Sequence, residues 1–537
     1  MNSSTIVDSF RTELGPVVPA KPLVYLTVLL LAVVFYLRQG PKSSIPLLNP
    51  KGRFDLTGNQ IKKEFDTACK GMLTSWFASN PDRAVRLNCD TGTATVLPPK
   101  FAVEVSNNRE FDLFEFLKGA YHVQLPGFDG LKEVCQPAHL VNNVIQKDLT
   151  KALPKLTKPA SEEAGAAIDR IFTTEQEFHS IPLGDSILQI ITCTTSRVFL
   201  GEKICRNEEW LKTAKAHAAG VFTAGYELRL WPAPIRPIIH WFLPRCREAR
   251  AQVGKARDII MPIVMERRAE KLQRESQGKP APEYNDAIYW FERATGGKGY
   301  DPVGAQLALS FSSIYTTTDL VCQVLINIAQ NPEILEPLRD EIRSVIGDKG
   351  WQSNSLFNMR LLDSVMKETQ RLKPIESGKS TPPNPSLYAV ADITNASALM
   401  RSLAVTDVKL SDGTIVPKGD VVAVSSHQMW NPERFQEPVK FDPYRFYHLR
   451  QEPGKEAASQ LANTSVDQYG FGLGRRACPG RFFATNSAKI VLTHILMKYD
   501  WKLQDGFEPK PIYRAFGVRF DPRTVLEARR REEHFDI

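Results

Sequence analysis

The segment FGLGRRACPG, residues 471–480, constrains the fold more than any other part of the chain. Its three glycines allow the backbone to turn tightly and to approach a flat ligand closely. An apolar helical pattern starts at Arg481, so Cys478 precedes a helix N-terminus, where unpaired N–H groups and the positive dipole end favour a thiolate. Taken alone, Cys478 would be assigned a buried structural role in a glycine-rich turn. The ten residues together predict a ligand site in which the Cys478 thiolate binds a metal.

Helical patterns dominate the rest of the chain. Asp301-Pro302 forms a good N-cap and first turn, and an apolar-rich segment then runs to Gln330. Such a helix would be about 43 Å long, enough to cross a whole domain. Further helices are expected over residues 333–346 and up to the segment MKETQRLKP, whereas the alternating stretch 403–426 predicts a small hairpin sheet. The expected fold is mainly α with a small β portion.

The N-terminal region predicts a membrane anchor. Residues 22–37 are apolar and uncharged, and basic residues follow them without a small-residue cleavage site, which argues against a cleaved signal peptide. The denser positive charge after the run places the bulk of the chain in the cytosol. We therefore expect a luminal arm over 1–21, a transmembrane anchor over 22–38, a Pro/Gly-containing linker over 39–55 and one catalytic domain over 56–537.

Charge and cysteine usage exclude several classes of protein. The net charge of +8 is modest, and no dense Lys/Arg stripe occurs with interleaved aromatics, so we expect no nucleic acid partner. The charge fits either an ordinary basic surface or a face that docks an acidic redox partner. None of the eight cysteines forms a CxxC pair, which argues against a zinc cluster or a disulfide framework. Most of them are expected to be small core residues in a reducing compartment.

The segment around the cysteine resembles the haem-binding signature of the cytochrome P450 family, F-x-x-G-x-R-x-C-x-G. Phe471, Gly474, Arg476, Cys478 and Gly480 match its five fixed positions. The resemblance implies a P450 fold and a haem b whose iron binds the Cys478 thiolate, which pushes electron density that promotes O–O cleavage. Phe471, Arg476 and Gly480 would contact the haem, and the Arg476 guanidinium suits a propionate.

The resemblance extends to a buried charge network. Glu368 and Arg371 match the E-x-x-R pair of the family, although three-residue spacing alone is equally typical of a surface ion pair. The third member is an arginine in a P-x-R-F segment, for which Arg434 and Arg445 are both candidates. We choose Arg445, because the segment FDPYRF lies nearer the distance from the cysteine that the family has. This network would hold the fold together.

The middle of the expected long helix supplies the oxygen-handling residues. The family has a small–small–x–acid–Thr–Thr stretch there, and Ser312-Ser313-Ile314-Tyr315-Thr316-Thr317 occupies that place. The resemblance assigns Thr316 and Thr317 as catalytic residues, with the Thr316 hydroxyl handling protons and opening the helix slightly to admit water. Tyr315 departs from the usual acid, so protons are expected to arrive through water or another side chain.

Finer similarities point to fungal secondary-metabolism monooxygenases of the gibberellin-pathway and indole-diterpene type. The matching strings are HVQLPGFDG (122–130), RVFLGE (197–202) and the segment 228–250. The resemblance implies a single-pass protein of the endoplasmic reticulum membrane that receives electrons from an NADPH–cytochrome P450 reductase, and a terpenoid-like substrate. The tryptophan that the family usually has on an early helix does not occur over 139–147.

One segment does not fit the family spacing. Residues 378–397 are turn-rich and aperiodic, and their removal would restore the usual distance to Arg401, which resembles a second propionate-binding arginine. The segment is either a surface loop or the translation of a retained intron.

Three functions are compatible with this site. The first is a membrane-anchored monooxygenase that uses O2 to hydroxylate or epoxidise a small lipophilic intermediate of fungal secondary metabolism. The second is a haem-thiolate isomerase or dehydratase that does not activate oxygen, against which the Thr316-Thr317 pair argues. The third is a non-enzymatic haem-binding protein. The long central helix with polar residues in its middle argues against it, because such a protein does not need that feature.

Overall fold

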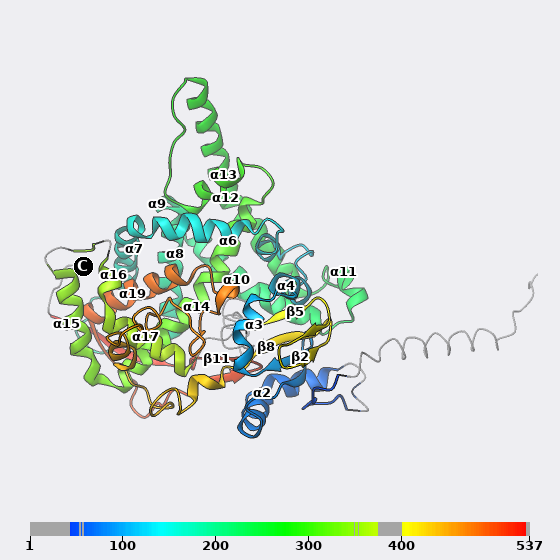
Figure 1. The fold of residues 1–537 in the computed structure, drawn as a ribbon. Helices are drawn as coiled ribbons and strands as arrows, with labels where there is room; N and C mark the ends of the chain where they lie inside the picture. Colours follow the sequence, from blue (N-terminus) through cyan, green and yellow to red (C-terminus); the bar gives the residue numbers. More distant parts are fainter. Residues whose placement is uncertain are drawn as a thin grey trace, which may run out of the picture. The chain divides into compact units, whose positions relative to one another are not determined.

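The computed structural model describes residues 43–52, 55, 58–347, 350–352, 354–373 and 400–532, nearly all within the compact unit Ile45–Ile537 (Figure 1). This unit is mainly helical. Its helices are α2 (Asn59–Ser79), α3 (Ala102–Asn107), α4 (Leu113–Tyr121), α5 (Asp129–Val134), α6 (Leu140–Val144), α7 (Thr150–Ile171), α8 (Leu183–Leu200), α9 (Glu202–Cys205), α10 (Glu208–Arg229), α11 (Arg236–Ile239), α12 (Pro244–Ser276), α13 (Ala287–Thr295), α14 (Pro302–Gln330), α15 (Leu335–Ile346), α16 (Ser355–Asn358), α17 (Arg360–Leu372), α18 (Arg445–Leu449) and α19 (Arg481–Lys498).

Helix α14 crosses the middle of this unit (Figure 1). Its start is set by Asp301, whose carboxylate accepts a hydrogen bond from the Val303 N–H at 3.1 Å, with Pro302 as the first helical residue. Almost all of its side chains are buried, because α5, α8, α10, α12 and α19 pack around it. A helix enclosed in this way can be apolar on every side. The expected helix from Asp301 to Gln330 is confirmed.

The strands form small sheets. The largest has the order β1-β2-β8-β5-β3, in which β2 and β8 run parallel and the other pairs run antiparallel. The remaining sheets are β4-β12-β9, β10-β11 and β6-β7. The strands are β1 (Val85–Cys89), β2 (Gly92–Leu97), β3 (Phe111–Asp112), β4 (His179–Pro182), β5 (Ser402–Ala404), β6 (Val408–Lys409), β7 (Ile415–Val416), β8 (Val421–Val424), β9 (Tyr499–Leu503), β10 (Ile512–Arg514), β11 (Gly517–Arg519) and β12 (Val525–Arg530).

The prediction of a self-contained hairpin sheet over 403–426 was wrong in part. Within this stretch β6 and β7 form a local antiparallel hairpin and β5 pairs antiparallel with β8, but β8 also joins the distant β2 and β5 also joins β3. The partner of a strand cannot be predicted from local sequence when that partner is far away along the chain. Alternation of apolar and polar residues indicates only which face of a strand is buried. This arrangement brings the start of β5, and with it Arg401, next to the first third of the chain.

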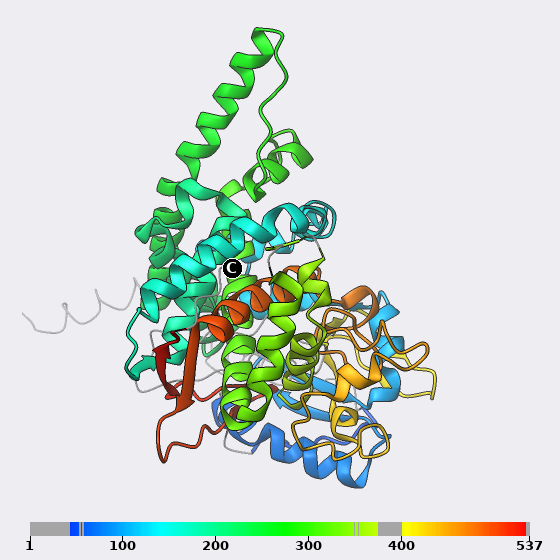
Figure 2. The same cartoon turned by 90° about the vertical axis from the view of Figure 1, so that its left-hand side faces the viewer.

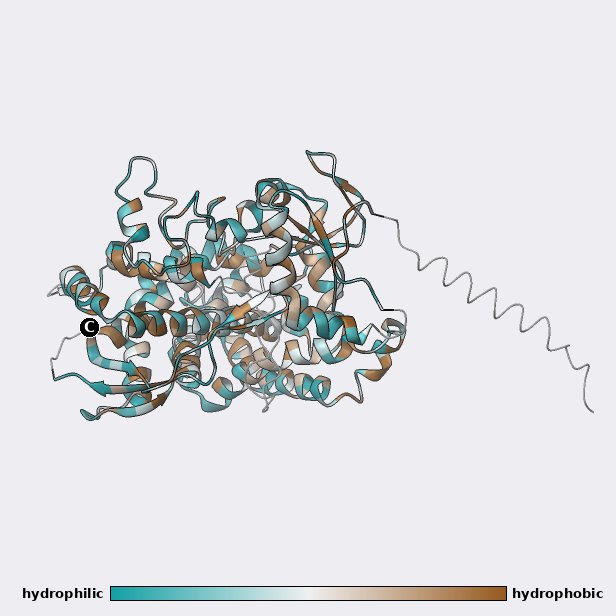
Figure 3. Cartoon of the chain, turned by 90° about the horizontal axis from the view of Figure 1, so that it is seen from below, coloured by the Kyte–Doolittle hydropathy of each residue, from teal (hydrophilic) through white to brown (hydrophobic). Residues whose placement is uncertain are grey.

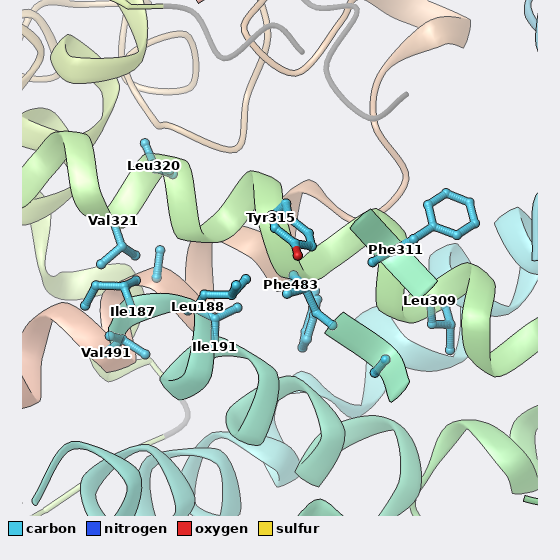
Figure 4. Packing of buried hydrophobic residues seen from close by; sticks show 14 of the residues in the cluster. Ile187, Leu188, Ile191, Leu309, Phe311, Tyr315, Leu320, Val321, Phe483 and Val491 are labelled. Carbon is cyan, nitrogen blue, oxygen red and sulfur yellow. The ribbon is translucent and has the colours of Figure 1, made fainter. Parts of the chain in front are cut away.

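The hydrophobic core lies between α14 and its neighbours. Figure 4 shows Ile187, Leu188 and Ile191 of α8 packed together with Val321 of α14 and Val491 of α19. Figure 2 shows the orange-red α19 next to the cyan and teal helices of the first half, in agreement with its contacts to α7 and α8. Brown and teal residues alternate along most helices in Figure 3, as expected for helices with one buried face.

The N-terminal predictions need one correction. Within the residues that the structure describes, no helix combines the length and the apolar character needed to cross a bilayer, so the expected single-pass localisation in the endoplasmic reticulum membrane is not supported. The expected arm over 1–21 and anchor over 22–38 lie outside the described residues, as does the segment 378–397. Residues inside the expected linker lie along β1, where the N–H of Leu48 donates to the backbone oxygen of Arg86 at 3.0 Å.

Candidate active site

The loop before α19 holds Cys478 in a tight turn. Gly472 has a φ of +75°, and a Cβ there would lie 2.4 Å from the backbone oxygen of Arg476, so no other residue fits. The Cys478 N–H donates to the backbone oxygen of Phe471 at 2.7 Å and closes the loop. Gly480 is the N-cap residue of α19, which places Cys478 two residues before that N-cap.

The Cys478 thiol opens on a cavity but is otherwise enclosed by protein atoms. Burial raises its pKa, while the Gly480 N–H and the charge of Arg481 act in the opposite direction. The Gly480 N–H thus acts in the expected direction, but desolvation of the buried thiolate outweighs it and the pKa of the Cys478 thiol is raised. A bound metal cation adds the charge that deprotonates a coordinating thiol.

The cavity has a volume of about 460 Å³ and lies between α14, the cysteine loop and the segment that includes α4 and α6. This volume is within the usual range for small-molecule and cofactor sites, roughly 300–1,000 Å³. The predicted site residues that line it are Thr316, Arg401, Phe471, Arg476, Cys478 and Gly480. Among the described residues that form its wall, Thr317 and the expected charge network do not appear.

Arg109 and Arg475 line the cavity together with the two predicted arginines, Arg401 and Arg476, so the wall carries positive charge. The Nε of Arg476 donates to the backbone oxygen of Val105 at 3.2 Å, its Nη2 to that of Asn108 at 3.2 Å, and its Nη1 to Ser402. Burial lowers the pKa of Arg476 to about 10, so the guanidinium keeps its charge at neutral pH. The guanidinium of Arg401 lies 5.4 Å from the centre of the Phe116 ring. Two such cations suit a ligand with carboxylates.

The middle of α14 presents hydroxyl groups to the cavity. Ser312, Ser313 and Thr316 all line it, and the Thr316 hydroxyl donates to the backbone oxygen of Ser312 at 3.1 Å. Thr317 is buried elsewhere, and within the described part of the chain its hydroxyl has no hydrogen-bond partner. The structure thus brings only the first of the two predicted catalytic threonines to the cavity.

The charge network lies outside the cavity, between α17 and the first residue of α18, Arg445. Arg371 donates to both carboxylate oxygens of Glu368 at 2.8 Å, and the Nε of Arg445 donates to Glu368 at 3.0 Å. Arg371 is fully buried and also donates to the backbone oxygens of Met429 and Pro438. The alternative candidate, Arg434, is half-exposed and pairs with Asp467 at 3.2 Å.

Sequence reasoning missed other polar residues of the wall. His139, just before α6, has a left-handed φ of 48°, lines the cavity and lies 4.4 Å from the Phe114 ring between ring centres. Asn142 lines the cavity as well. Both residues lie in the stretch 139–147, which lacks the family's usual tryptophan. The sequence did not predict them as site residues, because α6 is too short to show a clear helical periodicity.

These features define a class of enzyme. A cysteine that faces the cavity, arginines in the cavity wall and a helix with hydroxyls beside it fit a haem, whose iron the Cys478 thiolate would bind and whose propionates the arginines would hold. The site is that of a haem-thiolate protein.

Comparison with known proteins agrees with this class. The sequence profile of the family "Cytochrome P450" matches residues 138–378 and 394–526, more than half of the chain. The chain belongs to the cytochrome P450 family, whose cofactor is haem b with an axial cysteine thiolate, and it is a monooxygenase. The two matched ranges leave residues 379–393 unmatched between them.

Several fungal proteins are similar over most of their length. The chain is 43% identical over 514 residues to dihydromonacolin L monooxygenase LovA of Aspergillus terreus, with 95% of this chain and 93% of LovA covered. It is 42% identical over 460 residues to cytochrome P450 monooxygenase 1 of Gibberella fujikuroi, with 85% of this chain and 100% of that protein covered. The crystal structure of the cytochrome P450DA haem domain shares the fold, with a TM-score of 0.64 at 14% identity, covering 91% and 98% of the two chains.

Proposed function

We propose that this monooxygenase hydroxylates or epoxidises a lipophilic, terpenoid- or polyketide-type intermediate of fungal secondary metabolism. The observation that carries the proposal is one cavity with both Cys478 and Thr316 in its wall. Apolar side chains such as Phe114, Leu117 and Leu309 also line it and would contact a lipophilic substrate. Fungal relatives with names such as dihydromonacolin L monooxygenase support the class of substrate.

The proposal assigns the haem contacts residue by residue. Cys478 would hold the iron, Arg476 and Arg401 would bind the propionates, and Phe471 and Gly480 would pack against the macrocycle. The bound haem supplies oxygen activation, which the thiolate promotes.

The protein supplies orientation and proton handling. The Thr316 hydroxyl holds a proton at Oγ1 against the Ser312 carbonyl and can turn it toward the cavity. The apolar wall excludes bulk water and limits the poses of the substrate, which decides which carbon is exposed to oxidation.

The electrons are proposed to come from NADPH through a flavin-containing cytochrome P450 reductase. A redox partner is implied by the family, and the net charge of +8 is compatible with docking of an acidic protein surface.

We also propose that residues 378–397 are an insertion foreign to the family fold, either a tolerated loop or a translated intron. The interval of 379–393 between the two ranges that the family profile matches supports an insertion. Sequencing the transcript tests its origin, since a spliced message without these codons identifies an intron.

The main experiment combines the purified holoenzyme with reductase, NADPH, O2 and candidate lipophilic precursors. Mass spectrometry should detect a product heavier by one oxygen atom, labelled when 18O2 is used. A rearranged product without new oxygen would instead identify an isomerase and overturn the proposal.

A further inference from the structure

Tyr315 occupies the position at which the family has an acid beside the catalytic threonine. Its Oη donates to the backbone oxygen of Lys215 in α10 at 3.2 Å, so the side chain extends from α14 toward α10. Phe311, one turn earlier, faces α10 in the same way, with its ring 6.0 Å from that of Phe222. Tyr315 is absent from the described residues that line the cavity. Tyr315, at the position where the family has an acid, therefore serves helix packing. The protons that oxygen activation requires must reach the cavity through other groups.

Three other hydroxyls of α14 do line the cavity. Ser312 and Ser313 lie four and three residues before Thr316, a spacing that puts the three side chains on one face of the helix. Ser312 donates to the backbone oxygen of Ala308 at 2.7 Å and Ser313 to that of Leu309 at 2.8 Å, as Thr316 does to Ser312. Each hydroxyl hydrogen has a partner in the helix, while each hydroxyl oxygen can still accept a hydrogen bond.

This polar strip differs from the other hydroxyls of the same helix. Ser310 and Thr318 also donate to backbone oxygens one turn earlier, at 2.9 and 2.8 Å, but they are buried against protein and are not part of the cavity wall. A cavity wall with several hydroxyl oxygens offers an ordered water the two to four polar partners that it needs. The strip can therefore hold water between the helix and a bound ligand.

We propose that Ser312 and Ser313, together with Thr316, form a proton relay that replaces the missing acid. This inference rests on the proposed function. Each hydroxyl accepts one proton from water on one side as it releases its own on the other, so the serines are unchanged after each turnover. Two protons and the two electrons from NADPH reduce one atom of O2 to water, while the other atom enters the substrate.

The relay predicts the behaviour of a double variant, Ser312→Ala with Ser313→Ala. Haem content, measured from the ferrous–CO spectrum, should stay normal, because neither serine is among the residues proposed to hold the haem. Product formed per NADPH should fall by about tenfold, with the lost electrons recovered as hydrogen peroxide, and the solvent deuterium isotope effect on product formation should change. Ser310→Ala is the matched control, since it removes the same kind of bond on the same helix away from the cavity.

Unchanged coupling and an unchanged isotope effect in the double variant would overturn the relay. A crystal structure of the holoenzyme gives a readout that does not depend on turnover. Ordered water within hydrogen-bond distance of the Ser312 or Ser313 hydroxyl is expected, and a dry, apolar contact there would contradict the proposal. If the native enzyme forms no oxygenated product, the proposed function fails, while the water positions still test whether the strip can carry protons.

Discussion

The Tyr315 hydroxyl on α14 donates a hydrogen bond to the backbone oxygen of Lys215 on α10, across a hundred residues of sequence. The side chain of Tyr315, the residue before Thr316 in the sequence, is almost entirely buried. The bond therefore connects two core helices. A bond of this kind contributes to stability without taking part in the chemistry.

Tyr315→Phe should therefore lower the free energy of unfolding by about 1 kcal/mol, because the variant keeps the ring but removes the hydrogen bond to the partly buried Lys215 carbonyl. Product formed per NADPH should stay at the native level. Chemical denaturation and a coupling assay on the same preparation check both parts. A large loss of coupling with little loss of stability would make Tyr315 a proton donor.

Thr316→Ala should keep haem content and substrate binding but uncouple the enzyme. The Thr316 side chain lines the cavity and its hydroxyl donates to the helix backbone at Ser312, so its removal disturbs the fold little. Loss of a proton-handling group typically costs about 10²–10⁴-fold in rate. Peroxide release should rise in step with the fall in product. Thr318→Ala, away from the cavity, should behave like the native enzyme.

Cys478→Ser should abolish the haem-thiolate signature. A serine hydroxyl keeps the loop geometry but is a poor ligand for haem iron, so the long-wavelength Soret band of the ferrous–CO form should disappear. Cys246→Ala is the control, since Cys246 is buried on α12 with no role at the cavity. Retention of the band in the Cys478 variant would show that another residue binds the iron.

The charge network should be far more important for stability than an exposed pair. Glu368→Gln leaves Arg371 and Arg445 without their shared carboxylate, and breaking a buried network of this kind costs about 3–5 kcal/mol. The matched control is Asp467→Asn, which breaks the half-exposed pair with Arg434 and should cost less than about 1 kcal/mol. Urea denaturation distinguishes the two. Equal effects would mean that Glu368 is no more important than a surface residue.

Local patterns predicted part of this structure. The first and last residues of α14 could be predicted from Asp301-Pro302 and Asn331-Pro332. The tight turn of the cysteine loop could be predicted from its glycines, because only glycine fits at a position such as Gly472. The pairing of β2 with β8 and the bonds from Arg476 to Val105 and Asn108 join distant segments, which local periodicity does not report. The direction of the Tyr315 side chain likewise depends on where α10 packs.

A buried acid one turn after Thr316 has a pH-dependent effect on the fold. Asp319 is buried, accepts a hydrogen bond from the Phe520 N–H at 3.0 Å and is bonded by the Gln323 amide. Burial raises its pKa from 3.8 to about 6, although these two bonds favour the charged form. At neutral pH the folded protein therefore contains a desolvated carboxylate.

Asp319→Asn should remove that cost. Between pH 4 and pH 6 the folded native protein binds more protons at this site than the unfolded chain, so its stability falls as the pH rises through this window. The variant has no such group, and the Gln323 amide can turn its oxygen toward the new NH2 while Phe520 keeps its acceptor. The stability of the variant relative to the native protein should therefore increase between pH 4 and pH 7, by up to about 3 kcal/mol. Denaturation curves at both pH values measure the difference, and the comparison at pH 4 cancels any change in packing. A difference that does not depend on pH would show that Asp319 keeps an ordinary pKa in the folded protein.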